Sequence, residues 1–554
     1  MRLGSRLGGL ALAALALAAC SSSSSSSPQK AATPGPQWLA GDIHNHTFLT
    51  DGSHVESQVV YNAFERFGLD FMTNSEHGGT SARDTTGAAL AAGGLGDTAS
   101  ATNATIRPAT QRWRWETLRD ASYPLLLGAS GLQSQYPNQV LIQGVEWNVP
   151  THEHASVGLL ATSGQDVADF EYQFDGSDKD RSRDSGWVST VNTTVGATAP
   201  IKVAAPVEKD RFGTDLVKKN ATHADAVVGA AYLEAHYATS AYVVINHPSR
   251  QQKNSAAHLR DLNEAAPSVV IGIEGFPGHQ KESARGGYGN GPFYDATSAT
   301  TGTTDTTYRA RTYGGADYML AKLGGLMDSF WGEGRRFWVF LNSDFHSAAS
   351  SADFWPGEYA KTWIYAPGRS PADVMKGMKS GNIFIAHGDL VETLDVKVTA
   401  STASATLGGE LVVAPGTQVT VTVKFQSPSF NNNGDTPKVD HVDLITGSVT
   451  GKKDKNDVAA WASETNPTTG VAKRFTSTDW TVDGASRTMS YTFTPSASTY
   501  VRLRGTNQRL GSAKLDANGE PLMDEASTTS NTNTIDKAWT DLWFYTNPVF
   551  ITVR

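Results

Sequence analysis

The densest group of side chains able to do chemistry comes early, in Gly41-Asp42-Ile43-His44-Asn45-His46, followed by Thr50-Asp51-Gly52. Residues two apart in a strand point the same way, so His44 and His46 can face one ion. Asp51, on the loop beyond, can reach a neighbouring ion. A lone His-x-His is more often incidental, so a metal hypothesis depends on further donors elsewhere in the chain.

Further donors follow short apolar runs at four later points. They are Ser75-Glu76-His77, Gly144-Val145-Glu146 with Thr151-His152-Glu153-His154, Asn246-His247-Pro248, and Ser343-Asp344-Phe345-His346. Each alone has a bland explanation, such as a core histidine bonded to backbone or a turn aspartate. Because all four strand ends terminate in His, Glu or Asp, we predict one shared metal site. The only cysteine is Cys20, so nitrogen and oxygen ligands must hold the metal, which suits Zn²⁺, Mn²⁺ or Fe²⁺.

Such a site predicts hydrolysis by a metal-activated hydroxide. Bound metal ions lower the pKa of a water from ~15.7 to about 7 and stabilise the negative charge that develops when hydroxide attacks phosphorus or a carbonyl carbon. No Ser-His-Asp arrangement or Gly-rich phosphate loop stands out. His279 and His236 are candidate proton donors for the leaving group. Arg250 could bind a substrate anion or form a surface salt bridge, and Glu274, at the end of an apolar run, could belong to the site.

Strands and helices alternate from about residue 38 to 390. The runs 243–245, 269–271 and 337–341 are typical of buried parallel strands, and 55–67, 113–127 and 318–330 of helices. This alternation predicts an α/β barrel or a layered α/β domain. The Gly-, Ala-, Thr- and Ser-rich stretches 80–110 and 160–220 are expected to be long surface insertions.

The pattern changes after residue 392. The runs 394–398, 418–425, 488–493, 500–503 and 549–553 alternate with the period of a strand. They predict an all-β sandwich over residues 393–554. Of the 14 histidines, only His441 lies there, so we assign the chemistry to a domain spanning residues 38–392.

The N-terminus is typical of an exported protein. Arg2 and Arg6 precede an apolar run that is too short for a membrane span and ends in Leu17-Ala18-Ala19-Cys20. This ending resembles a bacterial lipobox, so we expect residues 1–20 to be a lipoprotein signal with Cys20 lipidated; an ordinary cleaved signal is the alternative. Residues 21–37 read as a Ser- and Pro-rich tether. We therefore expect a protein anchored at the cell envelope by lipid alone. The net charge of −9 argues against nucleic-acid binding.

The order of motifs over residues 40–390 resembles the polymerase and histidinol phosphatase (PHP) superfamily of metal-dependent phosphoesterases. Within this superfamily, the motifs resemble the carbaryl-hydrolase-like branch most. The motifs that suggest it are Gly144-Val145-Glu146, His154-Ala155-Ser156-Val157-Gly158 and Asn547-Pro548-Val549. The resemblance implies a distorted (β/α)₇ barrel, like a TIM barrel, with two or three metal ions at the strand ends.

The resemblance also implies a distribution of ligands. One ion would take His44, His46, Glu146 and Asp344; a second would share Glu146 and take His154 and His247; a third would use Asp51, His77 and His346. This chain has Glu76 where the family commonly has Asp, and we expect it to orient the His77 ring. His152 competes with His154, which is favoured because the residues after it match better.

Three functions follow from this interpretation. The first is a phosphoesterase that acts on small phosphate esters. The second keeps the metals but cleaves a carbamate, carboxylic ester or amide. The third is an inactive surface-binding protein, which is disfavoured because all nine expected ligand positions carry competent donors.

Overall fold

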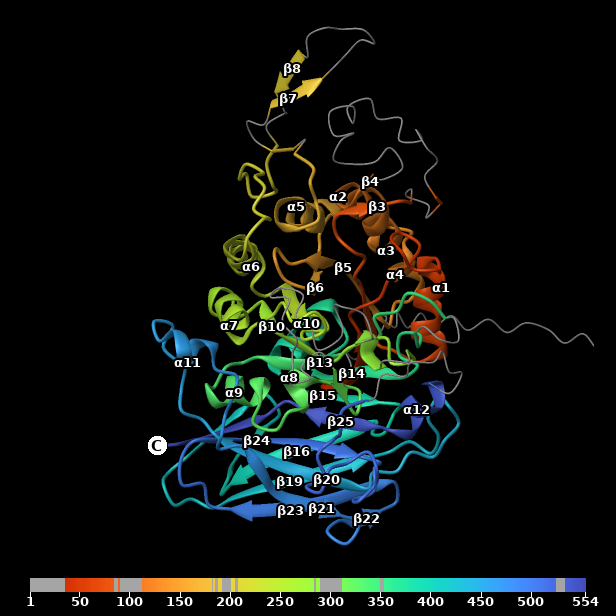
Figure 1. Ribbon diagram of the computed structural model, residues 1–554. Helices are drawn as coiled ribbons and strands as arrows, with labels where there is room; N and C mark the ends of the chain where they lie inside the picture. Colours follow the sequence, from red (N-terminus) through yellow and green to blue (C-terminus); the bar gives the residue numbers. More distant parts are fainter. Residues whose placement is uncertain are drawn as a thin grey trace, which may run out of the picture.

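In the computed structural model, the described residues are 35–83, 88–89, 112–181, 183–184, 188–191, 201–204, 208–282, 285–288, 311–348, 353–524 and 534–554. The expected signal, Cys20 and most of the tether lie outside them, as does most of 80–110. None of the described helices is both long and apolar enough to span a bilayer. Most helices lie toward one end of the molecule, and the C-terminal strands lie at the opposite end (Figure 1).

A mixed sheet organises the first part of the chain. Its strands are β1 (Gln37–Asp42), β2 (Phe71–Asn74), β5 (Val140–Asn148), β6 (His154–Leu159), β9 (Ala241–Ile245), β10 (Val270–Phe276), β13 (Trp338–Leu341), β14 (Ala360–Ala366) and β15 (Ile383–His387). They follow the order β13-β10-β9-β6-β5-β2-β1-β14-β15. The three predicted buried strands are confirmed, because β9, β10 and β13 pair in parallel and are wholly buried. The prediction of a mixed α/β fold is therefore confirmed.

The predicted (β/α)₇ barrel is not confirmed, because the described strands form no closed sheet. Two features depart from the predicted barrel. Strand β6 is inserted antiparallel between β5 and β9 and breaks the strand–helix alternation. At the outer edge of β13, side chains replace a neighbouring strand: the hydroxyl of Thr362 bonds both the N–H and the carbonyl of Leu341, and Asn547 Oδ1 accepts from the N–H of Val339.

The helices partly follow the predicted segments. They are α1 (Glu56–Tyr61), α2 (Arg114–Thr117), α3 (Tyr123–Leu127), α4 (Leu132–Gln135), α5 (Gly164–Phe174), α6 (His223–Tyr237), α7 (Ala256–Ala265), α8 (Tyr318–Ala321), α9 (Leu326–Gly332), α10 (Pro371–Ser380), α11 (Val458–Ala462) and α12 (Thr534–Thr540). Residues 62–66 and 118–122 are π-helical, and 285–287 form a 3₁₀ turn.

Two predictions about helices were wrong. The segment 318–330 is two helices, because Gly324 has a φ of 72° and interrupts the chain between α8 and α9. The stretch 160–220 is not simply a surface insertion, because it contains α5, which is almost entirely buried. Ser163 and Asp166 start this helix with a capping box.

The C-terminal part contains two sheets. One has the order β17-β16-β19-β23-β22, and the other contains β18, β20, β21, β24, β25 and β26. Their bounds are β16 (Thr393–Ala400), β17 (Ala403–Thr406), β18 (Glu410–Val413), β19 (Val419–Gln426), β20 (His441–Ser448), β21 (Gly470–Thr476), β22 (Thr481–Asp483), β23 (Ser486–Phe493), β24 (Thr499–Thr506), β25 (Trp543–Thr546) and β26 (Val549–Val553). All five predicted strand segments are present. One core cluster takes apolar side chains from both sheets, including Val421, Met489, Leu444 and Val501.

Hydrogen bonding continues across the expected boundary at 392/393. Strand β25 pairs with β15 on one side and β24 on the other, which joins the two parts into a 15-stranded sheet. Three short pairs lie outside it: β3 (Thr80–Ser81) with β4 (Arg112–Trp113), β7 (Val188–Val191) with β8 (Ile201–Ala204), and β11 (Thr312–Tyr313) with β12 (Ala316–Asp317).

Candidate metal centre

The predicted donors converge from separate strand ends. His44 and His46 follow β1, and Asp344 and His346 follow β13. Backbone bridges between Asn45 and Phe345, and between His77 and Glu146, hold these segments in parallel. The strands end at the same edge of the sheet, which is why donors as far apart in sequence as His44 and His346 meet.

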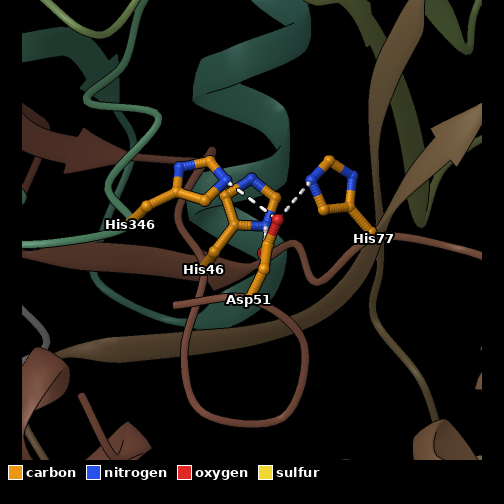
Figure 2. A group of neighbouring side chains, drawn as sticks. All are labelled: His46, Asp51, His77 and His346. Atoms are coloured by element: carbon orange, nitrogen blue, oxygen red, sulfur yellow. Dashed lines mark ion pairs between the residues drawn. The ribbon is translucent and has the colours of Figure 1, made fainter. Parts of the chain in front are cut away.

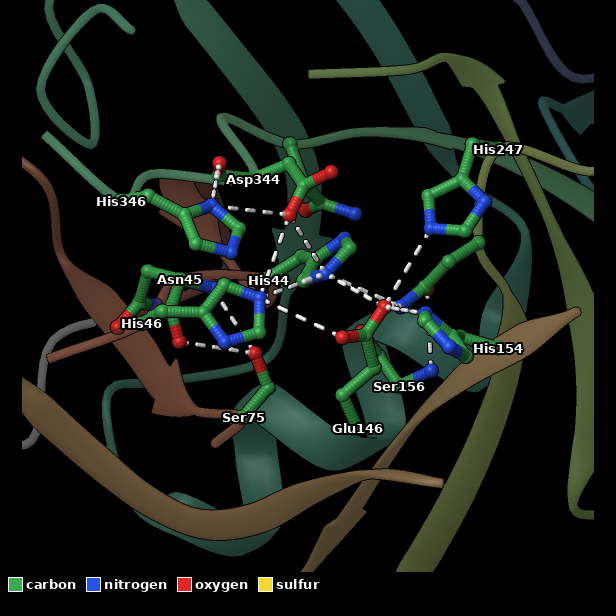
Figure 3. A network of polar contacts seen from close by, with 12 residues as sticks. His44, Asn45, His46, Ser75, Glu146, His154, Ser156, His247, Asp344 and His346 are labelled. Carbon is green, nitrogen blue, oxygen red and sulfur yellow. Dashed lines mark hydrogen bonds and ion pairs between the residues drawn. The ribbon is translucent and has the colours of Figure 1, made fainter. Parts of the chain in front are cut away.

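Glu146 lies at the centre of the group (Figure 3). Its carboxylate is fully buried on β5, and five imidazoles contact it. The contacts to Oε1 are His44 Nε2 at 2.9 Å, His154 Nδ1 at 3.0 Å and His247 Nε2 at 3.4 Å; those to Oε2 are His77 Nδ1 at 2.7 Å and His46 Nε2 at 3.4 Å. One carboxylate thus touches ligands assigned in the sequence to all three ions.

Asp344 lies on the other side of the histidine pair. Its Oδ1 is 3.0 Å from His44 Nε2 and 3.3 Å from His46 Nε2, and the two ring nitrogens are 3.2 Å apart. The structure thus brings together the four donors expected for the first ion: His44, His46, Glu146 and Asp344.

A second group forms around Asp51 (Figure 2). Its Oδ2 lies 3.3 Å from His77 Nε2 and 3.5 Å from His346 Nε2. These donors and His46 can offer ligand atoms within 4.8 Å of one another. The three donors expected for the third ion are therefore adjacent, with His46 between them and the first group.

The charges in this group strongly affect one another. Burial alone raises the pKa of Glu146, but His154 and His44 outweigh it and hold the pKa well below its usual value. Burial lowers the pKa of His77, yet Glu146 and Asp51 raise it to about 10. Burial and the neighbouring His346 and His77 lower the pKa of His46 to about 3. In the absence of metal, the group therefore holds protons on some rings and leaves others neutral.

Several residues brace the donors. Glu274 Oε1 lies 2.7 Å from His44 Nδ1, so it can accept the ring proton and leave Nε2 as the ligand atom. Asn246 donates to Glu146 Oε1 at 2.9 Å. Asp353 accepts from the backbone N–H of His346 and lies 2.6 Å from His279 Nδ1. The sequence left Glu274 open and missed Asp353 and the role of Asn246; only the position of Asn246 beside His247 could have drawn attention to it.

Two expectations about neighbouring residues are resolved by the geometry. Glu76 does not take the predicted position on the His77 ring; it accepts hydrogen bonds from the backbone and hydroxyl of Thr47 and from the hydroxyl of Thr50. The extra methylene lets it brace the loop that carries Asp51. His154, not His152, faces Glu146.

The candidate catalytic residues lie at the rim. His279 Nε2 is 2.9 Å from Asp344 Oδ2. Burial lowers the pKa of His279, but Asp344 and Asp353 raise it well above its usual value, so the ring is protonated. Arg250 Nη2 donates to His247 Nε2 at 2.8 Å, and Nη1 lies 3.6 Å from Asp344 Oδ2. His236 is placed elsewhere, stacked on Phe212 of a different segment.

The backbone is strained at three of these residues. His247, His279 and Asp344 have φ values of 28°, 55° and 48°, three of the seven positive values among described non-glycine residues. Such conformations cost of order 1–3 kcal/mol each and cluster where structure serves function. Here they turn side chains from different strand ends toward one point.

The donor set fits divalent metal ions. Because Glu274 takes the Nδ1 proton of His44, acceptor atoms of His44, His46, Glu146 and Asp344 face one another at 2.9–3.4 Å. Bonds of about 2.0–2.2 Å to a Zn²⁺ ion place its ligand atoms at such separations. Imidazole and carboxylate donors also suit Mn²⁺ and Fe²⁺.

No protein-family model matches this chain. No curated protein matches it either. Among solved structures, the chain matches one described as a two-domain protein containing a predicted PHP-like metal-dependent phosphoesterase, from Bacteroides vulgatus ATCC 8482. The match has 12% identity and a TM-score of 0.31, and it covers 89% of this chain and 95% of that one.

Proposed function

We propose that the protein is a metal-dependent hydrolase that cleaves small phosphate esters. The observation that carries this proposal is the buried Glu146 carboxylate with five imidazoles around it. A buried carboxylate needs matching positive charge. Protons on some of the rings supply it in the absence of metal, and two or three divalent ions, held by His44, His46, Asp51, His77, Glu146, His154, His247, Asp344 and His346, would take their place.

When bound, the ions would activate a water for attack and offset the negative charge of the transition state. The chain supplies the remaining functions. Glu274 fixes the ring of His44 through Nδ1. His279, protonated between Asp344 and Asp353, is placed to give a proton from Nε2 to a leaving group at the rim.

Arg250 favours a phosphate over a neutral ester. Its guanidinium lies beside both His247 and Asp344, and its side chain is only 11% exposed. A guanidinium can bind two oxygens of a phosphate at once. The motif resemblance to PHP phosphoesterases points to the same substrate class. Cleavage of a carbamate, carboxylic ester or amide remains the alternative.

We further propose that the protein acts at the cell envelope, exported and held by a lipid on Cys20. This rests on the basic, apolar and lipobox-like order of residues 1–20. Metabolic labelling with a radioactive fatty acid would label the wild-type chain and leave Cys20→Ser unlabelled if the proposal is right.

The proposed activity is tested with the full-length chain and three p-nitrophenyl substrates: the phosphate monoester, the phosphate diester and acetate. We expect turnover of a phosphate ester that stops with chelator. Both Glu146→Gln and His44→Ala should lower it by ~100-fold or more, since even residues that only orient ligands affect metal sites 10–100-fold. His236→Asn, outside the centre, is the matched control and should keep wild-type activity.

Each other result has a defined meaning. A preference for the monoester or the diester narrows the substrate class. Metal-dependent turnover of acetate alone replaces phosphate with carboxyl-ester chemistry. Protein that holds metal at the centre and turns over none of the three substrates contradicts the proposal and favours a binding protein.

A further inference from the structure

Three histidines outside the metal centre form a second cluster. His152 lies in the β5–β6 loop, His223 is the first residue of α6, and His258 lies in the first turn of α7. Each offers one ring nitrogen, and the three nitrogens lie within 4.8 Å of one another. Helices α6 and α7 lie side by side (Figure 1), so two helix starts and one loop meet here.

Hydrogen bonds define which nitrogens face inward. His152 Nδ1 lies 3.0 Å from the carbonyl oxygen of Lys253, so it carries the proton and leaves Nε2 with a lone pair. His223 Nε2 lies 3.3 Å from Asp261 Oδ2, which by the same argument leaves Nδ1 unprotonated. A backbone carbonyl and a carboxylate are the usual partners of metal-bound histidines.

The inward nitrogens then need a cation. His152 Nε2 and His223 Nδ1 are 2.8 Å apart, and two lone pairs at that distance repel each other. A shared proton could bridge this pair. It could not also reach His258, whose ring supplies the third nitrogen of the cluster.

We propose that His152, His223 and His258 bind a Zn²⁺ ion that is separate from the metal centre. Zinc–nitrogen bonds of about 2.0–2.1 Å place tetrahedral ligand atoms about 3.4 Å apart. His152 Nε2 and His223 Nδ1, now 2.8 Å apart, would therefore separate slightly around the ion, and the ring of His258 would complete the site from within 4.8 Å. Water takes the fourth position. This inference depends on the cluster alone and is independent of the proposed phosphoesterase activity.

The site would fasten the loop that serves the metal centre. His152 is two residues before His154, which contacts Glu146 at the centre. Thr151, immediately before the cluster, has a φ of 69°, a conformation that β-branched residues rarely adopt. A zinc ion would join this strained loop to the starts of α6 and α7 and so limit the movement of His154.

The test is the zinc content of dialysed full-length protein, measured by mass spectrometry of the element. His258→Asn and His223→Asn should each hold one zinc ion per chain fewer than the wild type. His236→Asn, in the same helix as His223, should match the wild type. Glu146→Gln should lose metal from the centre and still hold one zinc ion. If His258→Asn and His223→Asn hold as much zinc as the wild type, the proposal is wrong.

If circular dichroism shows that the variants do not fold, a second measurement tests the site in the wild-type protein. Crystals of the wild-type protein with zinc are measured at the zinc absorption edge. An anomalous peak among the three rings supports the site, and its absence overturns it. A peak that appears only in crystals grown with added zinc, with no matching ion in dialysed protein, also overturns it.

Discussion

Buried charge is arranged in opposite ways in two regions of the molecule. At the metal centre, the oxygens of Glu146 and Asp344 face ring nitrogens that are themselves potential ligands. At the contact between α9 and β24, Asp328 binds Arg502 through two hydrogen bonds of 2.7 Å. Tyr500 also donates to Asp328 at 2.9 Å.

The difference lies in where the counter-charge comes from. The Asp328–Arg502 pair is 1% exposed on both sides and holds its own cation, so every face of the carboxylate is matched within the chain. At the candidate metal centre, the charge that matches Glu146 and Asp344 comes from solution, either as protons on the rings or as bound ions. A buried ion pair that is complete within the chain is suited to joining two parts of a fold. A group of side chains whose matching charge comes from solution is suited to binding ions.

The largest expected effect comes from breaking the closed pair. Arg502→Met leaves Asp328 charged, buried and unmatched, which should lower the free energy of unfolding by about 3–5 kcal/mol. Urea denaturation measures this. Metal content per folded chain should not change. The double variant Asp328→Leu/Arg502→Met should recover most of the loss; if it is as unstable as the single variant, charge pairing is not what holds this contact.

A smaller effect is expected at the open site. Glu274→Gln keeps an acceptor near His44 but removes the charge, so metal affinity should fall by about 10- to 100-fold. Competition with a coloured chelator measures the affinity. Glu234→Gln is the control and should leave affinity unchanged, because this half-buried carboxylate of α6 accepts from the backbone N–H of Ser268, outside the centre. Equal affinity in Glu274→Gln and wild type would contradict the role assigned to Glu274.

The smallest effect is expected where a pair is exposed. Lys473 lies 2.7 Å from Asp479 on the C-terminal surface. Asp479→Asn should change the free energy of unfolding by less than about 1 kcal/mol, because water screens the pair. The hydrogen bonds from Lys473 and Thr476 lower the pKa of Asp479 to about 2. The stabilisation is therefore present above the unfolded pKa of ~3.9 and should shrink as pH falls from about 4 towards 2 in unfolding measurements. If Asp479→Asn lowers the free energy of unfolding as much as Arg502→Met does, exposed and buried ion pairs do not differ in this protein in the way that we propose.

Local patterns predicted the parts of the molecule that depend on local physics. Runs such as Val243-Val244-Ile245 are buried on both faces, and they form parallel strands as expected. The spacing of His44 and His46 predicted that both rings face one point, and their Nε2 atoms are 3.2 Å apart. The pair Gly324-Gly325 also signals a break in the helix predicted over 318–330. The sequence alone did not show that this signal would outweigh the apolar pattern around it.

Long-range pairing was not predictable in the same way. Nothing within 154–159 specifies that β6 runs antiparallel between β5 and β9, because its neighbours are chosen by the whole sheet. Asp353 reaches His279 across 74 residues. The sequence favoured His154 over His152 as the ligand, but it did not predict that His152, in the loop before β6, belongs to a second cluster with His223 and His258.

The sheet that passes from β15 to β25 affects how the chain is made. During translation, residues 383–386 emerge about 160 residues before their partners at 544–546. Until then, β15 has an unpaired edge, and β13 lacks the acceptor that Asn547 later gives to Val339. Unpaired strand edges recruit other chains. A chain whose synthesis stops before residue 543 would therefore be prone to aggregate, even though every candidate ligand of the metal centre had already been synthesised.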